Sequence, residues 1–225
     1  MKTVLELCSG YASFGTEAKK YGYDLLTIDY DSYFNPDICS DLFYIEKDDL
    51  PLRFQTPDII WASPDCTYFS VANIGRSWGG GYRKYMPKTK ETETAMALLA
   101  KVIILIDELK PKYWFIENPR GVMRKMCFMN EPTNLITNVP LNELRNEVCY
   151  CQYGDKRMKP TDIWTNLIWE SRPMCYNGCS DHEMALRGMP TGTQGLEKRD
   201  RSRIPSKLCI EILETIELMK ENQVV

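Results

Sequence analysis

Residues 58–70 read DIIWASPDCTYFS. The apolar run 59–62 has the length and continuity of a strand that is buried on both faces of a parallel sheet, and Pro64 ends it. Cys66 therefore lies just past the carboxyl end of a strand, where open α/β sheets place their chemistry. A thiol at this position is a candidate nucleophile, and the alternative is a half-buried structural cysteine.

The residues before this stretch predict the opening of a nucleotide-binding βαβ unit. A short apolar strand, 3–7, is followed by a turn of small residues and by a helical pattern over 11–21. Gly10 and Gly15 allow the backbone to approach a ligand closely. An ordinary turn between a strand and a helix has the same composition, so the glycines alone do not decide between the two interpretations.

A second predicted strand, 24–28, ends in the polar residues Asp29-Tyr30-Asp31. An acidic residue here, about 20 residues after a glycine turn, holds ribose hydroxyls in dinucleotide-type folds, and Tyr30 is placed to cover a purine ring. The alternative is a surface aspartate beside a half-exposed tyrosine. Together with the first turn, the pattern favours a ligand site.

A second candidate catalytic group follows Cys66 along the chain. A strong helical pattern at 92–109 leads to a buried strand at 113–116, which ends in Glu117 and Asn118. A carboxylate and a thiol at the ends of neighbouring strands form a working catalytic pair.

Two basic segments are candidate contacts for nucleic acid. Residues 71–90 mix glycines, basic residues and aromatics without periodicity, which predicts a loop that is either a lid over Cys66 or a solvated segment. Strands at 146–153 and 162–169 predict a hairpin at the sheet edge. Its turn, which either meets phosphates or is solvated, contains the basic residues Lys156, Arg157 and Lys159.

The composition restricts the class of protein. The chain has 225 residues, of which 44% are hydrophobic and 26% charged, and this predicts one globular domain. It shows no membrane-spanning apolar run and no signal-peptide pattern, so we expect an intracellular protein whose nine cysteines are mostly reduced. The net charge of −3 argues against a generic polyanion binder but allows a local basic face.

One stretch without periodicity, 174–195, contains candidate metal ligands. Cys175, Cys179 and His182 have the spacing C-x3-C-x2-H, and Cys149 or Cys151 could supply a fourth ligand for a structural zinc ion. Because this spacing is not a standard pairing of zinc ligands, the alternative is a chain that binds no metal.

Two motifs at strand ends resemble those of the DNA cytosine-5 methyltransferase family. Residues 63–70 (SPDCTYFS) are similar to the family's nucleophile motif, and Glu117-Asn118 matches its Glu-Asn motif. Weaker similarities lie in the same order and cover most of the chain: 5–15 (LELCSGYASFG), Asp29-Tyr30-Asp31 and Asp37-Ile38 with the cofactor motifs, and 202–208 (SRIPSKL) with the last motif.

The resemblance implies a fold and a set of site residues. The fold class is α/β, a Rossmann-like S-adenosylmethionine-dependent methyltransferase fold with a mostly parallel sheet, helices on both faces and a small irregular insertion. Cys66 would be the nucleophile, Glu117 would hold the cytosine, and Lys159 would replace an arginine that contacts the base. The implied cofactor contacts are Leu7, Cys8, Ser9, Gly10, Phe14, Gly15, Asp29, Tyr30, Asp37, Ile38, Ser63 and Pro64. The implied substrate contacts are Ser70, Arg76, Arg83, Asn118, Arg120 and Arg157.

The implied reaction is methylation of cytosine C5 in DNA by S-adenosylmethionine, through a bond between Cys66 and C6 of a flipped-out base, without a metal. One catalytic domain would cover 1–225, with a small insertion at 170–200 in place of a target-recognition domain. This is a compact form of phage or restriction-modification type, which we expect in the cytoplasm of a bacterial or phage-infected cell. The alternatives are the same chemistry on RNA or a free cytidine nucleotide, and a non-catalytic nucleic-acid-binding module.

Overall fold

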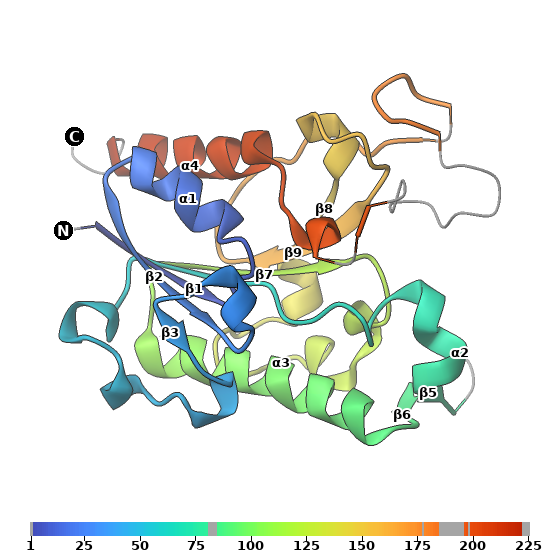
Figure 1. The fold of residues 1–225 in the computed structure, drawn as a ribbon, viewed down its shortest axis with the longest axis horizontal. Helices are drawn as coiled ribbons and strands as arrows, with labels where there is room; N and C mark the ends of the chain where they lie inside the picture. Colours follow the sequence, from blue (N-terminus) through green and yellow to red (C-terminus); the bar gives the residue numbers. More distant parts are fainter. Residues whose placement is uncertain (1, 81–84, 177, 185–195, 198, 222–225) are drawn as a thin grey trace.

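A seven-stranded sheet forms the centre of the computed structural model, which describes residues 2–80, 85–176, 178–184, 196–197 and 199–221 (Figure 1). The strands of this sheet are β1 (Lys2–Leu7), β2 (Tyr23–Asp29), β3 (Ile38–Cys39), β4 (Ile59–Ala62), β7 (Tyr113–Pro119), β8 (Arg145–Cys149) and β9 (Pro160–Thr165). Their order is β3-β2-β1-β4-β7-β9-β8. The strands from β3 to β7 run parallel, and β9 is antiparallel to both of its neighbours.

The strand order reverses between β1 and β4. From β1 the chain moves outward to β2 and β3, and it then returns to place β4 and β7 on the other side of β1. In open α/β sheets of this kind, the crevice at the carboxyl ends of the strands on either side of the reversal holds the ligand. The topology therefore predicts a ligand site at the carboxyl ends of β1, β2, β4 and β7.

Helices cover both faces of the sheet, as predicted (Figure 1). The helices α1 (Ser13–Lys20) and α4 (Ser206–Glu221) pack side by side on one face, and α3 (Lys90–Leu109) covers the other. Successive residues of a strand point to opposite faces, so each strand contributes to two cores. The core under α1 and α4 contains Val4, Ile59, Trp61 and Phe115. The core under α3 contains Leu5, Ile60, Ala62 and Ile116.

The prediction that 71–90 is a loop is wrong in its described part. The short helix α2 (Ile74–Ser77) leads into β5 (Trp78–Gly79), which pairs antiparallel with β6 (Met86–Pro87). Trp78 accounts for this regular structure, because its side chain is 3% exposed and its indole N–H donates to the carbonyl oxygen of Tyr68 at 2.6 Å. The segment is therefore packed against the loop that contains Cys66.

Other boundaries differ from the sequence prediction for local reasons. The first helix begins at Ser13 rather than at residue 11, because Ala12 adopts a left-handed conformation with φ 50°. Strand β8 ends at Cys149, and Tyr150–Tyr153 form a 3-10 turn. The hairpin at the sheet edge, the helix at 92–109 and the final helix are confirmed. Among the described residues, no helix has both the length and the apolar character needed to cross a membrane.

Candidate active site

Glu117 lies in the last part of β7, beside the point where the Cys66 loop leaves β4. Strands β4 and β7 are paired in parallel, with Ala62 opposite Ile116, so the residues that follow each strand emerge at the same edge. The side chain of Asn118 donates through Nδ2 to the carbonyl oxygen of Pro64 at 2.9 Å, and this bond ties the two strand ends together.

Further along, the Cys66 loop is held by the backbone that follows β7. Ser70 forms an isolated antiparallel bridge with Gly121, and the amide of Val122 donates to the carbonyl oxygen of Phe69 at 2.8 Å. A Cβ atom at position 121 would lie 2.2 Å from that oxygen, so only glycine permits the approach. The two loops form one unit, which fixes the position of Cys66 relative to Glu117.

The carboxyl group of Glu117 has a hydrogen-bond partner that sequence reasoning missed. Glu117 is 5% exposed, and the buried hydroxyl of Tyr150 donates to its Oε1 at 2.8 Å. Burial and the charge of Glu117 both raise the pKa of Tyr150 well above its ordinary value, so the hydroxyl stays protonated and remains a donor. Tyr150 lies in the 3-10 turn after β8, a position that no motif spacing singles out.

The charges of the other two residues predicted to be catalytic, Glu117 and Lys159, both act on the Cys66 thiol. Burial raises the pKa of the Cys66 thiol, the positive charge of Lys159 lowers it, and the carboxylates of Glu117 and Asp65 raise it. Lys159 Nζ lies 4.6 Å from the centre of the Tyr150 ring and donates to the carbonyl oxygen of Arg201 at 3.1 Å. The charge of Lys159 thus opposes the effect of burial, and the net result is a Cys66 pKa above its ordinary value.

The glycine turn after β1 and the first turn of α1 are held by two carboxyl groups. Asp29 accepts a hydrogen bond from the amide of Gly10 at 2.8 Å, and Glu6 accepts one from the amide of Gly15 at 2.7 Å. Cys8 and Ala12 adopt left-handed conformations in this turn, each at a cost of about 1–2 kcal/mol. Backbone strain of this kind clusters at ligand sites.

A cavity of about 300 Å³ opens beside this turn, and it is acidic. Its carboxylates come from four different segments: Asp29, Asp41, Asp65 and Glu91. Burial and the charges of Asp29, Asp41 and Asp65 raise the pKa of the Cys8 thiol far above its ordinary value, so this cysteine stays neutral. Asp65 lines the cavity and is adjacent to Cys66, so the cavity reaches the loop that bears the candidate nucleophile.

Of the predicted cofactor contacts, Cys8, Asp29 and Tyr30 line the cavity. Asp37 instead accepts two hydrogen bonds from Thr27, which hold β3 against β2. The other predicted contacts are not among the residues that line the cavity and stay predictions: Leu7, Ser9, Gly10, Phe14, Gly15, Ile38, Ser63 and Pro64. The sequence missed Asp41 and Glu91, which reach the cavity from segments far apart in the chain.

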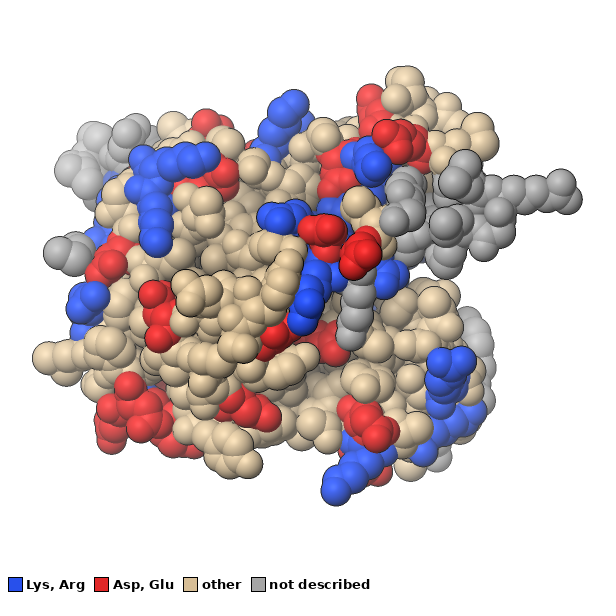
Figure 2. All heavy atoms as spheres, in the orientation of Figure 1, with Lys and Arg blue, Asp and Glu red and all other residues tan. Residues whose placement is uncertain are grey.

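The structure places the predicted substrate contacts in different surroundings. Asn118 and Ser70 join the two strand-end loops, as described. Arg157 is 2% exposed, pairs with Asp155, and donates to the carbonyl oxygens of Arg201 and Arg203 at 2.9 Å, so it holds the chain before α4. Of the remaining three, Arg120 forms an ion pair with Glu147, Arg76 is exposed on α2, and Arg83 lies outside the described residues. On the face drawn in Figure 2, basic side chains are interspersed with acidic ones.

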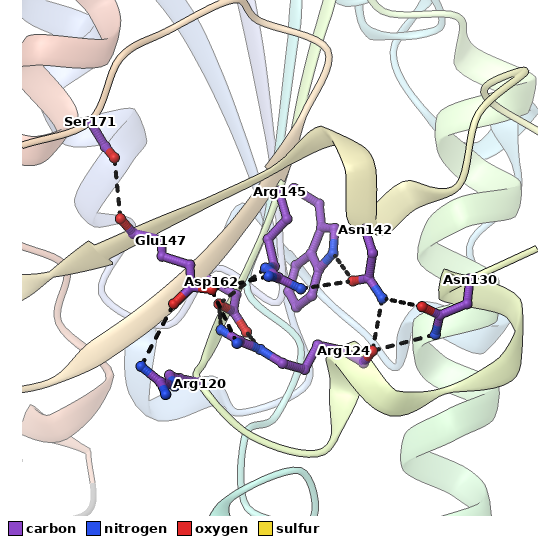
Figure 3. A network of polar contacts seen from close by, with 9 residues as sticks. Arg120, Arg124, Asn130, Asn142, Arg145, Glu147, Asp162 and Ser171 are labelled. Carbon is purple, nitrogen blue, oxygen red and sulfur yellow. Dashed lines mark hydrogen bonds and ion pairs between the residues drawn. The ribbon is translucent and has the colours of Figure 1, made fainter. Parts of the chain in front are cut away.

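The hairpin that bears Tyr150 and Lys159 is fixed by a polar network beneath it (Figure 3). Arg124 donates to the fully buried carboxylate of Asp162 at 2.8 Å and to Glu147 at 3.1 Å. Arg145 reaches the same Glu147 at 3.0 Å. The network joins both strands of the hairpin to the chain that follows β7. Tyr150 follows one of these hairpin strands and Glu117 lies in β7, so the network helps to fix the position of Tyr150 relative to Glu117.

The buried carboxyl group of Glu6 should make the protein less stable as the pH rises. Burial raises the pKa of its carboxyl group to about 8, although amide donors from Gly15 and Phe14 lower it. Because this value lies above the unfolded one, the associated stability is fully present below about pH 4.5 and is lost as the pH rises through about 8. Between about pH 6 and about pH 8.5, wild type should lose on the order of 2 kcal/mol more than Glu6→Gln, whose side chain does not titrate. Urea unfolding at both pH values measures the difference, and equal losses in the two proteins would contradict it.

The chain is similar to several known proteins. No protein-family model matches it. The solved structures of Spodoptera frugiperda DNMT2 (19% identity, TM-score 0.46) and of the Entamoeba histolytica methyltransferase EhMeth (14%, TM-score 0.48) each align with 77% of the chain. The chain spans 55% and 56% of those two proteins, about half their length.

A relative from Frog virus 3 is similar over nearly its whole length. It is named a probable DNA (cytosine-5)-methyltransferase, and it is 31% identical over 230 residues, which cover 94% of this chain and 98% of the relative. The viral relative is therefore about as short as this chain. From this similarity we conclude that the chain belongs to the DNA (cytosine-5)-methyltransferase family.

Proposed function

We propose that this chain transfers a methyl group from S-adenosylmethionine to C5 of cytosine in DNA, through a covalent bond between Cys66 Sγ and C6 of the base. One observation carries the proposal. A thiol follows β4, and a buried carboxyl group lies near the end of the paired strand β7, next to an acidic cavity at the ends of β1 and β2.

The cavity suits the cofactor in charge and position. S-adenosylmethionine supplies, when bound, an electrophilic methyl group on a positively charged sulfur, and four carboxylates line the cavity. The hydroxyl oxygen of Ser9, which is 7% exposed, has no hydrogen-bond partner within the described residues. A buried polar atom without a partner costs about 1–3 kcal/mol, and a ligand group in the turn would remove that cost. Asp29 and Tyr30 would hold the ribose and the adenine.

Each residue of the site has a separate role in the proposed reaction. The Cys66 thiolate adds to C6 of cytosine, and electron density moves to C5, which becomes nucleophilic enough to take the methyl group. Glu117 hydrogen-bonds the N3 side of the base and stabilises the charge that develops there, while Tyr150 fixes its carboxyl group. Loss of the C5 proton to a base or a water molecule then lets the thiolate leave, which restores the double bond and frees Cys66.

The target base has to leave the duplex to reach this site. Asn118, the residue after Glu117, is fully buried, and its Oδ1 has no hydrogen-bond partner in the described part of the chain. A base that enters beside Glu117 could supply that partner if the strand-end loops open. Trp78 of β5 packs against the Cys66 loop, and the described elements α2, β5 and β6 would border the flipped nucleotide. The protein would act wherever the cell holds DNA.

Transfer of a labelled methyl group tests the proposal. The full chain is incubated with methyl-labelled S-adenosylmethionine and one of four acceptors: unmethylated genomic duplex DNA, single-stranded DNA, RNA, or deoxycytidine monophosphate. Genomic DNA presents every short recognition sequence, so the unknown target does not limit the test. We expect 5-methyldeoxycytidine in the nucleosides digested from duplex DNA. Label confined to RNA or to the free nucleotide would overturn the choice of substrate, and binding of DNA without any transfer would indicate a non-catalytic module.

A further inference from the structure

A cluster of metal-ligating side chains lies outside the candidate active site. Cys151, Cys175, Cys179 and His182 place one potential ligand atom each within 4.8 Å of one another. Cys179 Sγ lies 3.1 Å from His182 Nδ1, and Cys175 Sγ lies 3.4 Å from the same nitrogen. Cys151 is buried and the other three are half-buried. The ligands come from two segments, the turn after β8 and the irregular chain at 175–182.

The dimensions fit a tetrahedral zinc site. Zinc binds thiolate sulfur at about 2.3 Å, so neighbouring ligand atoms of a tetrahedral site lie about 3.8 Å apart. The distances in the cluster bracket this value, from 2.9 Å between the sulfurs of Cys175 and Cys179 to the overall limit of 4.8 Å. Three cysteines and one histidine form a common ligand set of structural zinc sites, in which no position is left open for catalysis.

The surroundings of the cluster support the ligands. Gln152 Nε2 lies 3.8 Å from Cys151 Sγ and donates to Asp181 Oδ2 at 3.0 Å, which links the two ligand-bearing segments. The amide of Glu183 donates to the carbonyl oxygen of Lys156 at 2.9 Å, and Arg172 donates to the carbonyl oxygen of Gln152 at 2.9 Å. Outer contacts of this kind orient ligands in metal sites.

We propose that Cys151, Cys175, Cys179 and His182 bind one structural zinc ion. The ion would fasten the irregular segment 172–183, which has neither a helix nor a strand at its described positions, to the turn after β8. Cys151 is adjacent to Tyr150, whose hydroxyl donates to Glu117, so the same ion would stabilise the turn that positions the catalytic carboxyl group. The proposal selects Cys151 over Cys149 as the fourth ligand.

Metal analysis of the full chain tests the site. Protein produced in zinc-supplemented medium and purified under reducing conditions, without a metal-binding tag, should contain about one zinc ion per chain. Cys175→Ser, His182→Ala and Cys151→Ser should each lower the content below about 0.2 ions per chain. Cys149→Ser is the matched control, because Cys149 and Cys151 are buried alike, at 0% and 3% exposure, and it should retain zinc.

A second measurement does not depend on the folding of any variant. Wild-type protein stripped with a chelator and titrated with Co²⁺ should develop the visible absorption of tetrahedral cobalt and the ultraviolet band of thiolate-to-cobalt charge transfer. Absence of both zinc and these bands would overturn the proposal, as would a disulfide between Cys175 and Cys179 in the reduced preparation. Loss of zinc in Cys149→Ser with retention in Cys151→Ser would overturn the ligand assignment. None of these readouts depends on methylation, so the two proposals fail separately.

Discussion

Cys66→Ala is expected to lower methyl transfer by at least about a thousandfold, because no bond to C6 can form and C5 of cytosine stays a poor nucleophile. Binding of S-adenosylmethionine should be nearly unchanged. The cavity is lined by Asp29, Asp41, Asp65 and Glu91, and Cys66 itself is not among its lining residues. Transfer assays and equilibrium dialysis with the labelled cofactor, performed on the same preparation, measure the two effects.

The matched control for this variant is Cys127→Ala, which removes an exposed thiol outside the site. It should keep wild-type activity and should show that loss of a cysteine does not by itself impair the protein. Activity of Cys66→Ala close to that of wild type would exclude Cys66 as the nucleophile. Loss of cofactor binding together with activity would show instead that the alanine disturbs the loop.

Glu117→Gln is expected to lower the turnover number by about a hundredfold or more, with a smaller effect on the Michaelis constant for DNA. Glutamine fills the same space and still accepts the hydrogen bond that Tyr150 donates to Glu117 Oε1, so the local structure should persist. What it cannot do is share a proton with the base as charge develops during attack at C6. Steady-state kinetics with DNA under saturating cofactor separates the two parameters.

Tyr150→Phe provides the comparison for Glu117→Gln. It removes the hydroxyl that positions the carboxyl group, and the carboxyl group itself remains. The loss should be about tenfold, the size of one buried hydrogen bond, and should fall on turnover. A Glu117→Gln enzyme as active as wild type, or a Tyr150→Phe enzyme more impaired than Glu117→Gln, would contradict the roles assigned here.

The parts of the site that the sequence predicts follow directly from the strands. Cys66 and Glu117 each come at the end of a continuous apolar run, and such runs form the interior strands of a parallel sheet. The carboxyl ends of parallel strands meet at one edge, so the position of the two residues follows once both strands are identified. The resemblance to the family implies the α/β fold with helices on both faces, which the structure confirms.

The missed residues belong to contacts between distant segments. Tyr150 reaches Glu117 from a turn after the edge strand β8, and β8 is separated from β7 by β9. Asp41 and Glu91 reach the cavity from a 3-10 turn and from the start of α3. Arg157, which the sequence assigned to substrate, pairs with Asp155 because the basic turn folds inward. No local pattern specifies these contacts, since they depend on how the elements pack.

Covalent trapping with DNA that contains 5-fluorocytosine tests the central claim most directly. Release of the enzyme requires loss of the C5 hydrogen as a proton. Fluorine in place of that hydrogen cannot be removed in this way, so the bond between the enzyme and C6 should persist after methyl transfer. In the presence of S-adenosylmethionine, we expect a denaturant-resistant complex with DNA, and mass spectrometry of its proteolytic peptides should locate the base on Cys66. A complex that forms at another cysteine, or complete absence of a complex under conditions in which ordinary DNA is methylated, would contradict the account.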